Sequence, residues 1–208
     1  MDDLDNLFIL KDNPYSFEDV QGVGQPCEWD RGTYISQKEG VHYLVSGLII
    51  VRRTLEDGQS KSLFIVQKKH FFHDIAYAQQ IPGLTQVSAL RKSSGLYFSP
   101  GSIEKLFRIS TDFVRAFLFS LACKGRTLGT DATMLGLLPS HKRLYFLLEN
   151  LAAYNPQSSN REFSREVQLS QVEIGEYLSL RRESVNRLIQ KLEKENLIFH
   201  ERGKIWLR

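Results

Sequence analysis

The chain has 208 residues, of which 42% are hydrophobic and 25% are charged. This composition excludes an intrinsically disordered protein and leaves room for one or two ordinary cores. The formal net charge of +3 excludes binding of nucleic acid through bulk charge alone, and the whole surplus lies in residues 140–208, which carry 12 Lys/Arg and 9 Asp/Glu.

The N-terminus, Met1-Asp2-Asp3, is acidic and does not resemble a signal peptide. No run of 18 apolar residues follows it, so we expect a cytoplasmic protein without membrane contact. The two cysteines, Cys27 and Cys123, are too few for a disulfide scaffold or for a cysteine-ligated iron–sulfur cluster. We expect each of them to be a small buried hydrophobic residue.

From about Phe17 to Ser99, short apolar runs alternate with turn signals, which predicts a β-roll or jelly roll. A hairpin is expected within residues 52–66, where Gly58 would supply the positive φ of its turn. The other expected strands are residues 43–45, 48–51, 87–90 and 96–99.

A long helix is predicted over residues 111–138, where apolar residues recur at every seventh position: Val114, Leu121, Leu128 and Leu135. This spacing is typical of a coiled-coil seam and predicts a homodimer. Gly125 and Gly129 interrupt the helix, and Pro139 ends it. We therefore expect a sensing domain of residues 1–110, a dimerisation helix of residues 111–138 and a third domain of residues 139–208.

Ser140 is expected to cap the next helix, which has leucines at helical spacing from Leu144 to Leu151, and residues 155–166 are expected to form a loop. Ser170 and Glu173 then form a capping box, so a further helix begins near Gln171. Gly175 in this helix has no side chain and permits a neighbouring helix to cross closely.

Another helix follows, with a core stripe of Val185, Leu188, Ile189 and Leu192. Its opposite face carries side chains that suit base-edge readout in a DNA major groove: Arg182, Glu183, Asn186, Arg187, Gln190 and Lys194. A solvated charged face is the alternative for an arbitrary helix. The preceding capped helix and the expected hairpin of residues 197–199 and 204–207 favour a winged helix-turn-helix instead.

Three segments of this region, residues 174–175, 182–187 and 192–198, resemble the C-terminal domain of Crp/Fnr transcription regulators in order and spacing. Ser179 and Arg181 depart from the usual pattern, in which a glycine and a Ser or Thr are common. The resemblance implies a two-fold symmetric operator in double-stranded DNA with a TGA-like half-site core, and contact with RNA polymerase. The DNA-binding residues that we predict are Ser170, Gln171, Arg182, Glu183, Ser184, Asn186, Arg187 and Gln190.

The N-terminal region resembles the cyclic-nucleotide-binding barrel of the same family. Where receptors of this fold have a Gly-Glu pair, this chain has His73-Asp74, and no arginine lies between Val66 and Arg91. A buried phosphate would lack a bidentate partner, so we expect an effector other than a cyclic nucleotide. An apolar molecule with a carboxylate or phenol group is our alternative, bound by Phe72, His73, Asp74, Tyr77 and Thr85.

Two other functions remain open at this point, and no cofactor is identified. His42, His70 and His73 could ligate haem or a metal ion, although a pair such as His70 and His73 is more often hydrogen-bonded within a turn. Visible absorbance would distinguish a haem sensor. A cupin-like enzyme is disfavoured, because no catalytic constellation has motif-grade spacing. The predicted architecture is thus α+β, with an N-terminal β-roll, a long dimerisation helix and a C-terminal winged helix-turn-helix, in a protein that is not an enzyme.

Overall fold

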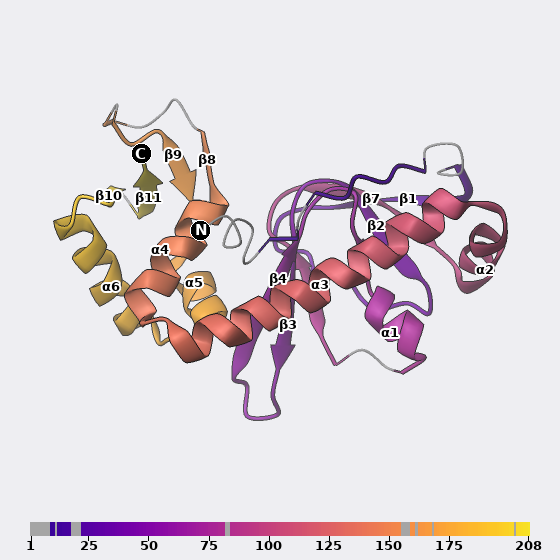
Figure 1. The fold of residues 1–208 in the computed structure, drawn as a ribbon, viewed down its shortest axis with the longest axis horizontal. Helices are drawn as coiled ribbons and strands as arrows, with labels where there is room; N and C mark the ends of the chain where they lie inside the picture. Colours follow the sequence, from indigo (N-terminus) through magenta and orange to yellow (C-terminus); the bar gives the residue numbers. More distant parts are fainter. Residues whose placement is uncertain are drawn as a thin grey trace. The chain divides into compact units, whose positions relative to one another are not determined.

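We analysed a computed structural model of the chain (Figure 1). It describes residues 9–10, 12–17, 22–81, 84–154, 159–160, 162–167, 169–201 and 203–208. The described residues form two compact units, one of residues 9–129 and one of residues 130–208. The division falls inside the longest helix, α3 (Thr111–Leu137).

The first unit is built on two antiparallel sheets. One has the strand order β1-β7-β2-β5 and the other the order β4-β3-β6. The strands are β1 (Gln25–Trp29), β2 (Val41–Ser46), β3 (Ile49–Thr54), β4 (Ser60–Val66), β5 (Phe71–Phe72), β6 (Gln86–Ala89) and β7 (Ser93–Phe98). The β3–β4 hairpin has Gly58 at φ 83°, as its sequence predicts.

Three helices belong wholly or partly to this unit: α1 (Asp74–Gln79), α2 (Pro100–Ile109) and the first part of α3. Ser99 caps α2, because its hydroxyl accepts a hydrogen bond from the Ser102 N–H. Neither α1 nor α2 was predicted from the sequence. Helix α1 is shorter than two turns and its residues lack a helical stripe, so it has no pattern by which a helix is recognised.

Two clusters of buried side chains form the core of the first unit, and α3 contributes to both. Cys123 joins the cluster around Phe64 and Phe72. Phe113 and Phe117 join an aromatic cluster with Phe17, Tyr43, Phe71 and Phe98. The prediction of a buried Cys123 is confirmed, whereas Cys27 is only half-buried and the prediction for it is wrong: it lies on β1, the outermost strand of its sheet.

The predicted seam of α3 is half-buried or exposed in the single chain. Leu121 and Leu128 pack in part against the two core clusters. Leu135 of the seam is 41% exposed, and Leu118, which lies beside the seam, is 59% exposed. Gly125 lies between them, and a Cβ atom there would meet no atom within 4 Å apart from those of its own helix turn.

The second unit contains three further helices and one antiparallel sheet of order β10-β11-β9-β8. Its elements are α4 (Ser140–Leu151), β8 (Ala152–Tyr154), β9 (Arg165–Val167), α5 (Gln171–Leu178), α6 (Arg182–Lys194), β10 (Ile198–Glu201) and β11 (Lys204–Leu207). Buried Leu144, Leu147 and Leu148 of α4 are part of its core.

Two details of this unit correct the sequence analysis. Residues 165–166 belong to strand β9 rather than to a loop, since a strand of three residues is too short to show an alternating pattern. Residues 155–158 and 161 of that expected loop lie outside the described residues. The N-cap of α4 is Pro139 with an extended backbone, so Ser140 is the first helical residue and does not cap the helix.

Taken with the wing formed by β10 and β11, these elements confirm the predicted architecture: α+β, with an N-terminal β-roll, a long helix and a C-terminal winged helix-turn-helix. No helix among the described residues combines the length and the apolar character that crossing a membrane requires.

Candidate nucleic-acid interface and effector cavity

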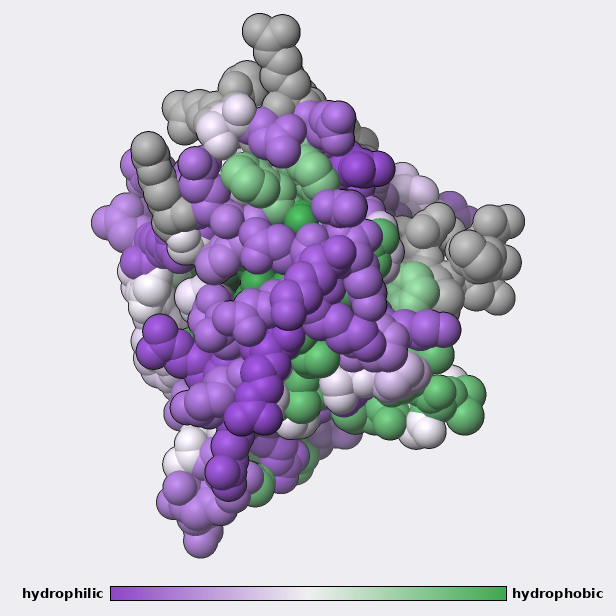
Figure 2. Space-filling model, turned by 90° about the vertical axis from the view of Figure 1, so that its left-hand side faces the viewer, coloured by the Kyte–Doolittle hydropathy of each residue, from purple (hydrophilic) through white to green (hydrophobic). Residues whose placement is uncertain are grey.

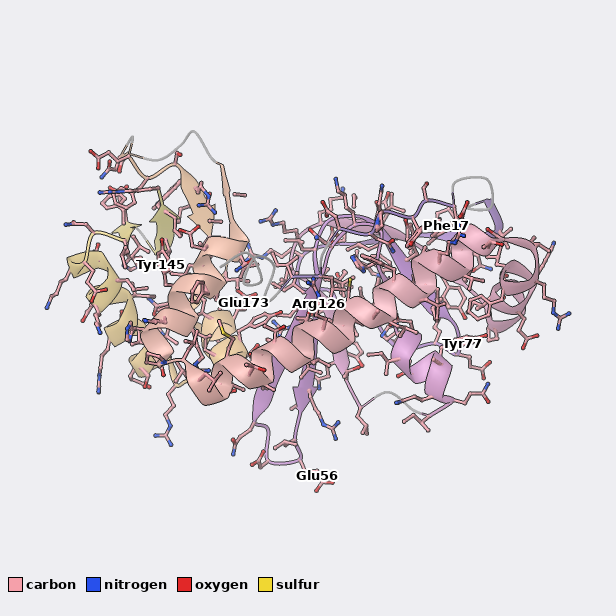
Figure 3. The ribbon with its side chains drawn as sticks, in the orientation of Figure 1. Phe17, Glu56, Tyr77, Arg126, Tyr145 and Glu173 are labelled. Atoms are coloured by element: carbon pink, nitrogen blue, oxygen red, sulfur yellow. The ribbon has the colours of Figure 1, made fainter. Side chains whose placement is uncertain are left out.

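Helix α5 begins at a complete capping box. The Ser170 hydroxyl accepts from the Glu173 N–H at 3.2 Å, and the Glu173 carboxylate accepts from the Ser170 N–H at 2.7 Å. Figure 3 labels Glu173 at this helix. The two bonds satisfy donors that the helix start would otherwise leave free. The Ser170 hydroxyl is an acceptor in this box and keeps its own proton for a further contact. Ser170 is exposed, and Gln171, the next predicted DNA-binding residue, is half-buried.

The turn between α5 and α6 is tight. Ser179 ends α5 in the left-handed region at φ 55°, the conformation for which glycine is the usual residue. A Cβ atom at Gly175 would come within 2.6 Å of the Leu180 carbonyl oxygen. Gly175 is thus required by the close approach of the turn backbone, rather than by a crossing helix.

Helix α6 separates a buried side from an exposed one. Val185, Ile189 and Leu192 are buried. The exposed predicted residues are Arg182, Glu183, Asn186, Arg187 and Gln190, and Ser184 is half-buried. Among the described residues, none of the five exposed side chains has a hydrogen-bond or ion-pair partner. Figure 2 turns the side of the molecule with α6 toward the viewer, and this face is mostly hydrophilic.

Arg181 is the N-cap of α6, and its side chain makes no capping hydrogen bond. The wing follows α6, with Gly203 in its turn at φ 79°. Arg202, between the two expected strands of the wing, lies outside the described residues. Lys204 of the wing is paired with Glu166 at 2.9 Å. Among the described residues, the five exposed candidate side chains of α6 are thus unpaired, whereas Lys204 of the wing is not.

The β-roll contains a cavity of about 190 Å³. Four of the predicted effector-binding residues line it, namely Phe72, His73, Asp74 and Thr85. Tyr77 (Figure 3) does not line this cavity; it borders a separate surface hollow with Lys38 and Pro100. The α1 residues that line the cavity are Asp74, Ile75, Ala76 and Gln79, so Tyr77 is the predicted effector-binding residue that lies away from it.

The cavity wall contains a buried ion pair that the sequence analysis missed. The Lys124 ammonium of α3 donates to the Asp74 carboxylate at 2.5 Å, to the Phe71 carbonyl at 2.8 Å and to the Ser120 hydroxyl at 2.9 Å. Both charged side chains are 2% exposed. Burial lowers the pKa of Lys124, and the neighbouring Asp74 opposes that shift.

Arg53 also borders the cavity. The absence of an arginine from residues 67–90 therefore does not leave the cavity without cations, because β3 and α3 supply one each. The sequence feature that could have pointed to this buried ion pair is Lys124, a charged residue among the apolar positions of α3.

Three histidines lie in or beside the cavity wall. His42 and His73 approach through their Nδ1 atoms at 3.1 Å. Burial lowers the pKa of His73 to about 4. Burial, with smaller effects of His73 and Lys38, lowers the pKa of His42 to about 3. Both imidazoles are therefore neutral near pH 7, and one must donate the hydrogen bond that the other accepts.

His70 is fully buried, with its Nδ1 atom 3.3 Å from the Ser120 hydroxyl. That hydroxyl already accepts from Lys124 and from the Phe71 N–H, so its own proton is directed to His70. Two of the three histidines that were considered as haem or metal ligands are thus bonded to each other, and the third to a serine. The described residues contain no group of three His, Cys, Asp or Glu side chains with the geometry of a metal site.

Comparison with known proteins agrees with this geometry. Residues 142–208 match the family of Crp-like helix-turn-helix domains. The chain is 23% identical over 163 residues to the cAMP-activated global transcriptional regulator CRP of Pasteurella multocida, covering 77% of each protein. Residues 142–208 are therefore a Crp-like helix-turn-helix domain.

Solved structures of Crp/Fnr regulators share the fold over nearly the whole chain. The c-di-GMP-responsive regulator CLP of Xanthomonas campestris superposes with a TM-score of 0.77 at 16% identity, over 91% of this chain and 96% of that one. CprK in complex with OCPA gives a TM-score of 0.69 at 17% identity, over 98% and 94%. These relatives are named for cAMP, c-di-GMP and OCPA, so the Crp/Fnr fold does not by itself specify an effector.

The buried histidines of the β-roll predict a stability that depends on pH. In the unfolded chain a histidine binds a proton near pH 6.5, whereas folded His42 and His73 stay neutral until about pH 3 and pH 4. The unfolded state therefore binds more protons below pH 6.5. The free energy of unfolding should fall as the pH falls from 6.5 toward 4, by up to about 1.4 kcal/mol per pH unit for each histidine.

Urea unfolding between pH 7 and pH 4.5 measures this slope. The variant His42→Phe keeps an aromatic ring against Phe72 and should flatten the slope. His141→Gln, on α4 and outside the β-roll, should leave it unchanged. If the slope were unchanged in His42→Phe, the pH dependence would not come from the buried histidine pair.

Proposed function

We propose that this chain is a homodimeric regulator that recognises a specific DNA sequence through α6 and responds to a small molecule in the β-roll. The observation that carries the proposal is the row of exposed, unpaired polar side chains on α6, next to a capped helix and a wing. A helix of this kind in a winged helix-turn-helix suits the DNA major groove.

The residue types on α6 suggest individual roles. Arg182 and Arg187 suit bidentate contacts with guanine, and Glu183 suits the amino group of cytosine. Asn186 suits adenine or a phosphate, and it leaves open which form of TGA-like half-site is preferred. Gln171 and the backbone at the start of α5 are proposed to contact the DNA backbone, since helix N-termini favour phosphate groups.

Dimerisation through α3 is the second part of the proposal. The stripe of Val114, Leu118, Leu121, Gly125 and Leu128 follows the alternating spacing of four and three residues that a coiled coil requires. Two copies would present two α6 helices to half-sites about 34 Å apart on a two-fold symmetric operator. Contact with RNA polymerase and a cytoplasmic location stay predictions, and we propose no enzymatic activity.

Replacing Arg187 with alanine tests the assignment of α6. We expect a loss of about 1–3 kcal/mol in operator binding and a relaxed preference at one base pair of each half-site. Lys142→Ala, which removes the same charge from an exposed position of α4, is the matched control and should have a smaller effect on affinity and none on preference. If Arg187→Ala behaved like Lys142→Ala in a binding titration, α6 would not be the reading helix.

The third part of the proposal concerns cyclic nucleotides. A cavity of about 190 Å³ is small for a purine, a ribose and a phosphate together, and the Lys124 ammonium is already bonded to Asp74. We therefore expect no binding of cyclic AMP or cyclic GMP at micromolar concentration in a calorimetric titration. Micromolar binding of either would contradict our interpretation of the cavity.

A further inference from the structure

The cavity in the β-roll is small and mostly apolar. Its inner wall comes from β3, β4, β6 and α3, through residues such as Val51, Phe64, Val87 and Leu128. Its outer wall includes Ile75 and Ala76 of α1. An engineered apolar cavity of about 150 Å³ binds benzene. A cavity of about 190 Å³ therefore matches one six-membered ring with a small substituent.

The buried charges in the wall are already satisfied. An ammonium group has three protons, and those of Lys124 are directed to Asp74, Phe71 and Ser120. The Asp74 carboxylate also accepts from the Ile75 N–H. A ligand anion placed here would add an uncompensated charge beside Asp74, which is costly in an apolar cavity. Arg53 is exposed and hydrated, so it offers little compensation.

His73 is a buried polar side chain of the cavity wall that keeps one nitrogen atom for a ligand. It is 8% exposed, and it lines the cavity. Its Nδ1 atom is bonded to His42, whereas no described residue bonds its Nε2 atom. Because either histidine can be the donor in the pair, the His73 Nε2 atom can either donate or accept, provided that His42 takes the complementary tautomer.

We propose that the cavity binds an uncharged, largely apolar molecule of about one ring, whose single hydroxyl or carbonyl group hydrogen-bonds to His73 Nε2. This inference deepens the proposed function and rests on it for the regulatory consequence. A ligand that binds the folded β-roll also raises its thermal stability, and it alters operator affinity if it binds the two DNA-binding states unequally. The carboxylate-bearing effector considered from the sequence is not favoured by the paired charges.

Three probes of nearly equal size test the ligand class on the full chain: toluene, benzyl alcohol and benzoate. Benzyl alcohol should bind most tightly in a calorimetric or NMR titration. Its affinity should exceed that of toluene roughly 2- to 12-fold, which is the range expected for one hydrogen bond. Benzoate should bind most weakly. Tightest binding of benzoate, or no binding of any probe at millimolar concentration, would overturn the proposal.

Two variants test the polar anchor. His73→Asn removes the imidazole while tolerating the left-handed backbone of this position, φ 64°. It should reduce benzyl alcohol binding to the level of toluene and leave toluene binding unchanged. Thr85→Val, a change of similar shape in the same wall, should preserve the difference. If Thr85→Val abolished the difference in affinity between benzyl alcohol and toluene and His73→Asn did not, His73 would not be the residue that bonds the ligand's polar group.

The wild-type probe series decides the ligand class even if a variant fails to fold. Operator selection by the wild-type chain without any probe is measured separately. Failure there would contradict the proposed function, whereas failure of the probe series alongside successful operator selection would contradict this inference alone.

Discussion

Replacing Lys124 with methionine is expected to lower the free energy of unfolding by about 3–5 kcal/mol, the range measured when one partner of a buried ion pair is removed. Methionine keeps the length of the side chain but leaves the Asp74 carboxylate buried and unpaired. The Phe71 carbonyl and the Ser120 hydroxyl also lose a donor. The ion pair links α3 to the start of α1, so the loss should affect the whole β-roll.

Urea unfolding measures this loss, and the chain offers a specific probe for it. Trp29 lies in the β-roll and Trp206 in the second unit, so a Trp206→Phe background makes fluorescence report on the β-roll. Lys105→Met, at an exposed position of α2, is the matched control and should cost less than about 0.5 kcal/mol. Adding Asp74→Asn to Lys124→Met should restore part of the stability. Equal effects of Lys124→Met and Lys105→Met would contradict the buried pair.

Replacing Leu118 with glutamate should separate the dimer and weaken operator binding by roughly 10²- to 10⁴-fold, because the second half-site then loses its linked partner. Leu118 is 59% exposed in the single chain and belongs to neither core cluster. The substitution therefore places charges in the proposed seam without disturbing the β-roll, which Leu121 or Leu128 variants would also affect.

Sedimentation at micromolar concentration and an operator titration measure the two effects. Leu55→Glu makes the same change at a residue of similar exposure, 56%, outside α3. It should leave both the dimer and the affinity intact. A wild-type chain that is monomeric under these conditions would contradict dimerisation through α3.

Local sequence patterns predicted most elements of the fold. The capping box at Ser170 and Glu173, the apolar stripe of α6 and the turn at Gly58 each depend on residues within a few positions of one another. The exposed face of α6 follows from the same periodicity. The row of DNA-binding candidates could therefore be listed before any coordinates were known.

The wall of the cavity could not be predicted in the same way. Asp74 and Lys124 are 50 residues apart in sequence and His42 and His73 are 31 apart, so no local pattern joins them. The two sides of α3 presented a related difficulty, because a repeat of seven suits both a coiled-coil seam and a stripe that packs on a β-roll. The exposed fractions of Leu118 and Leu121 distinguish the two only in the folded chain.

Selection of bound fragments from random double-stranded DNA tests the central claim most directly, namely that α6 reads a specific sequence as part of a dimer. The wild-type chain should enrich a two-fold symmetric sequence with TGA-like half-sites whose centres lie about 34 Å apart. The Arg187→Ala variant should lose preference at one position in each half-site. Fragments without a common sequence, or a single unpaired half-site, would contradict the account.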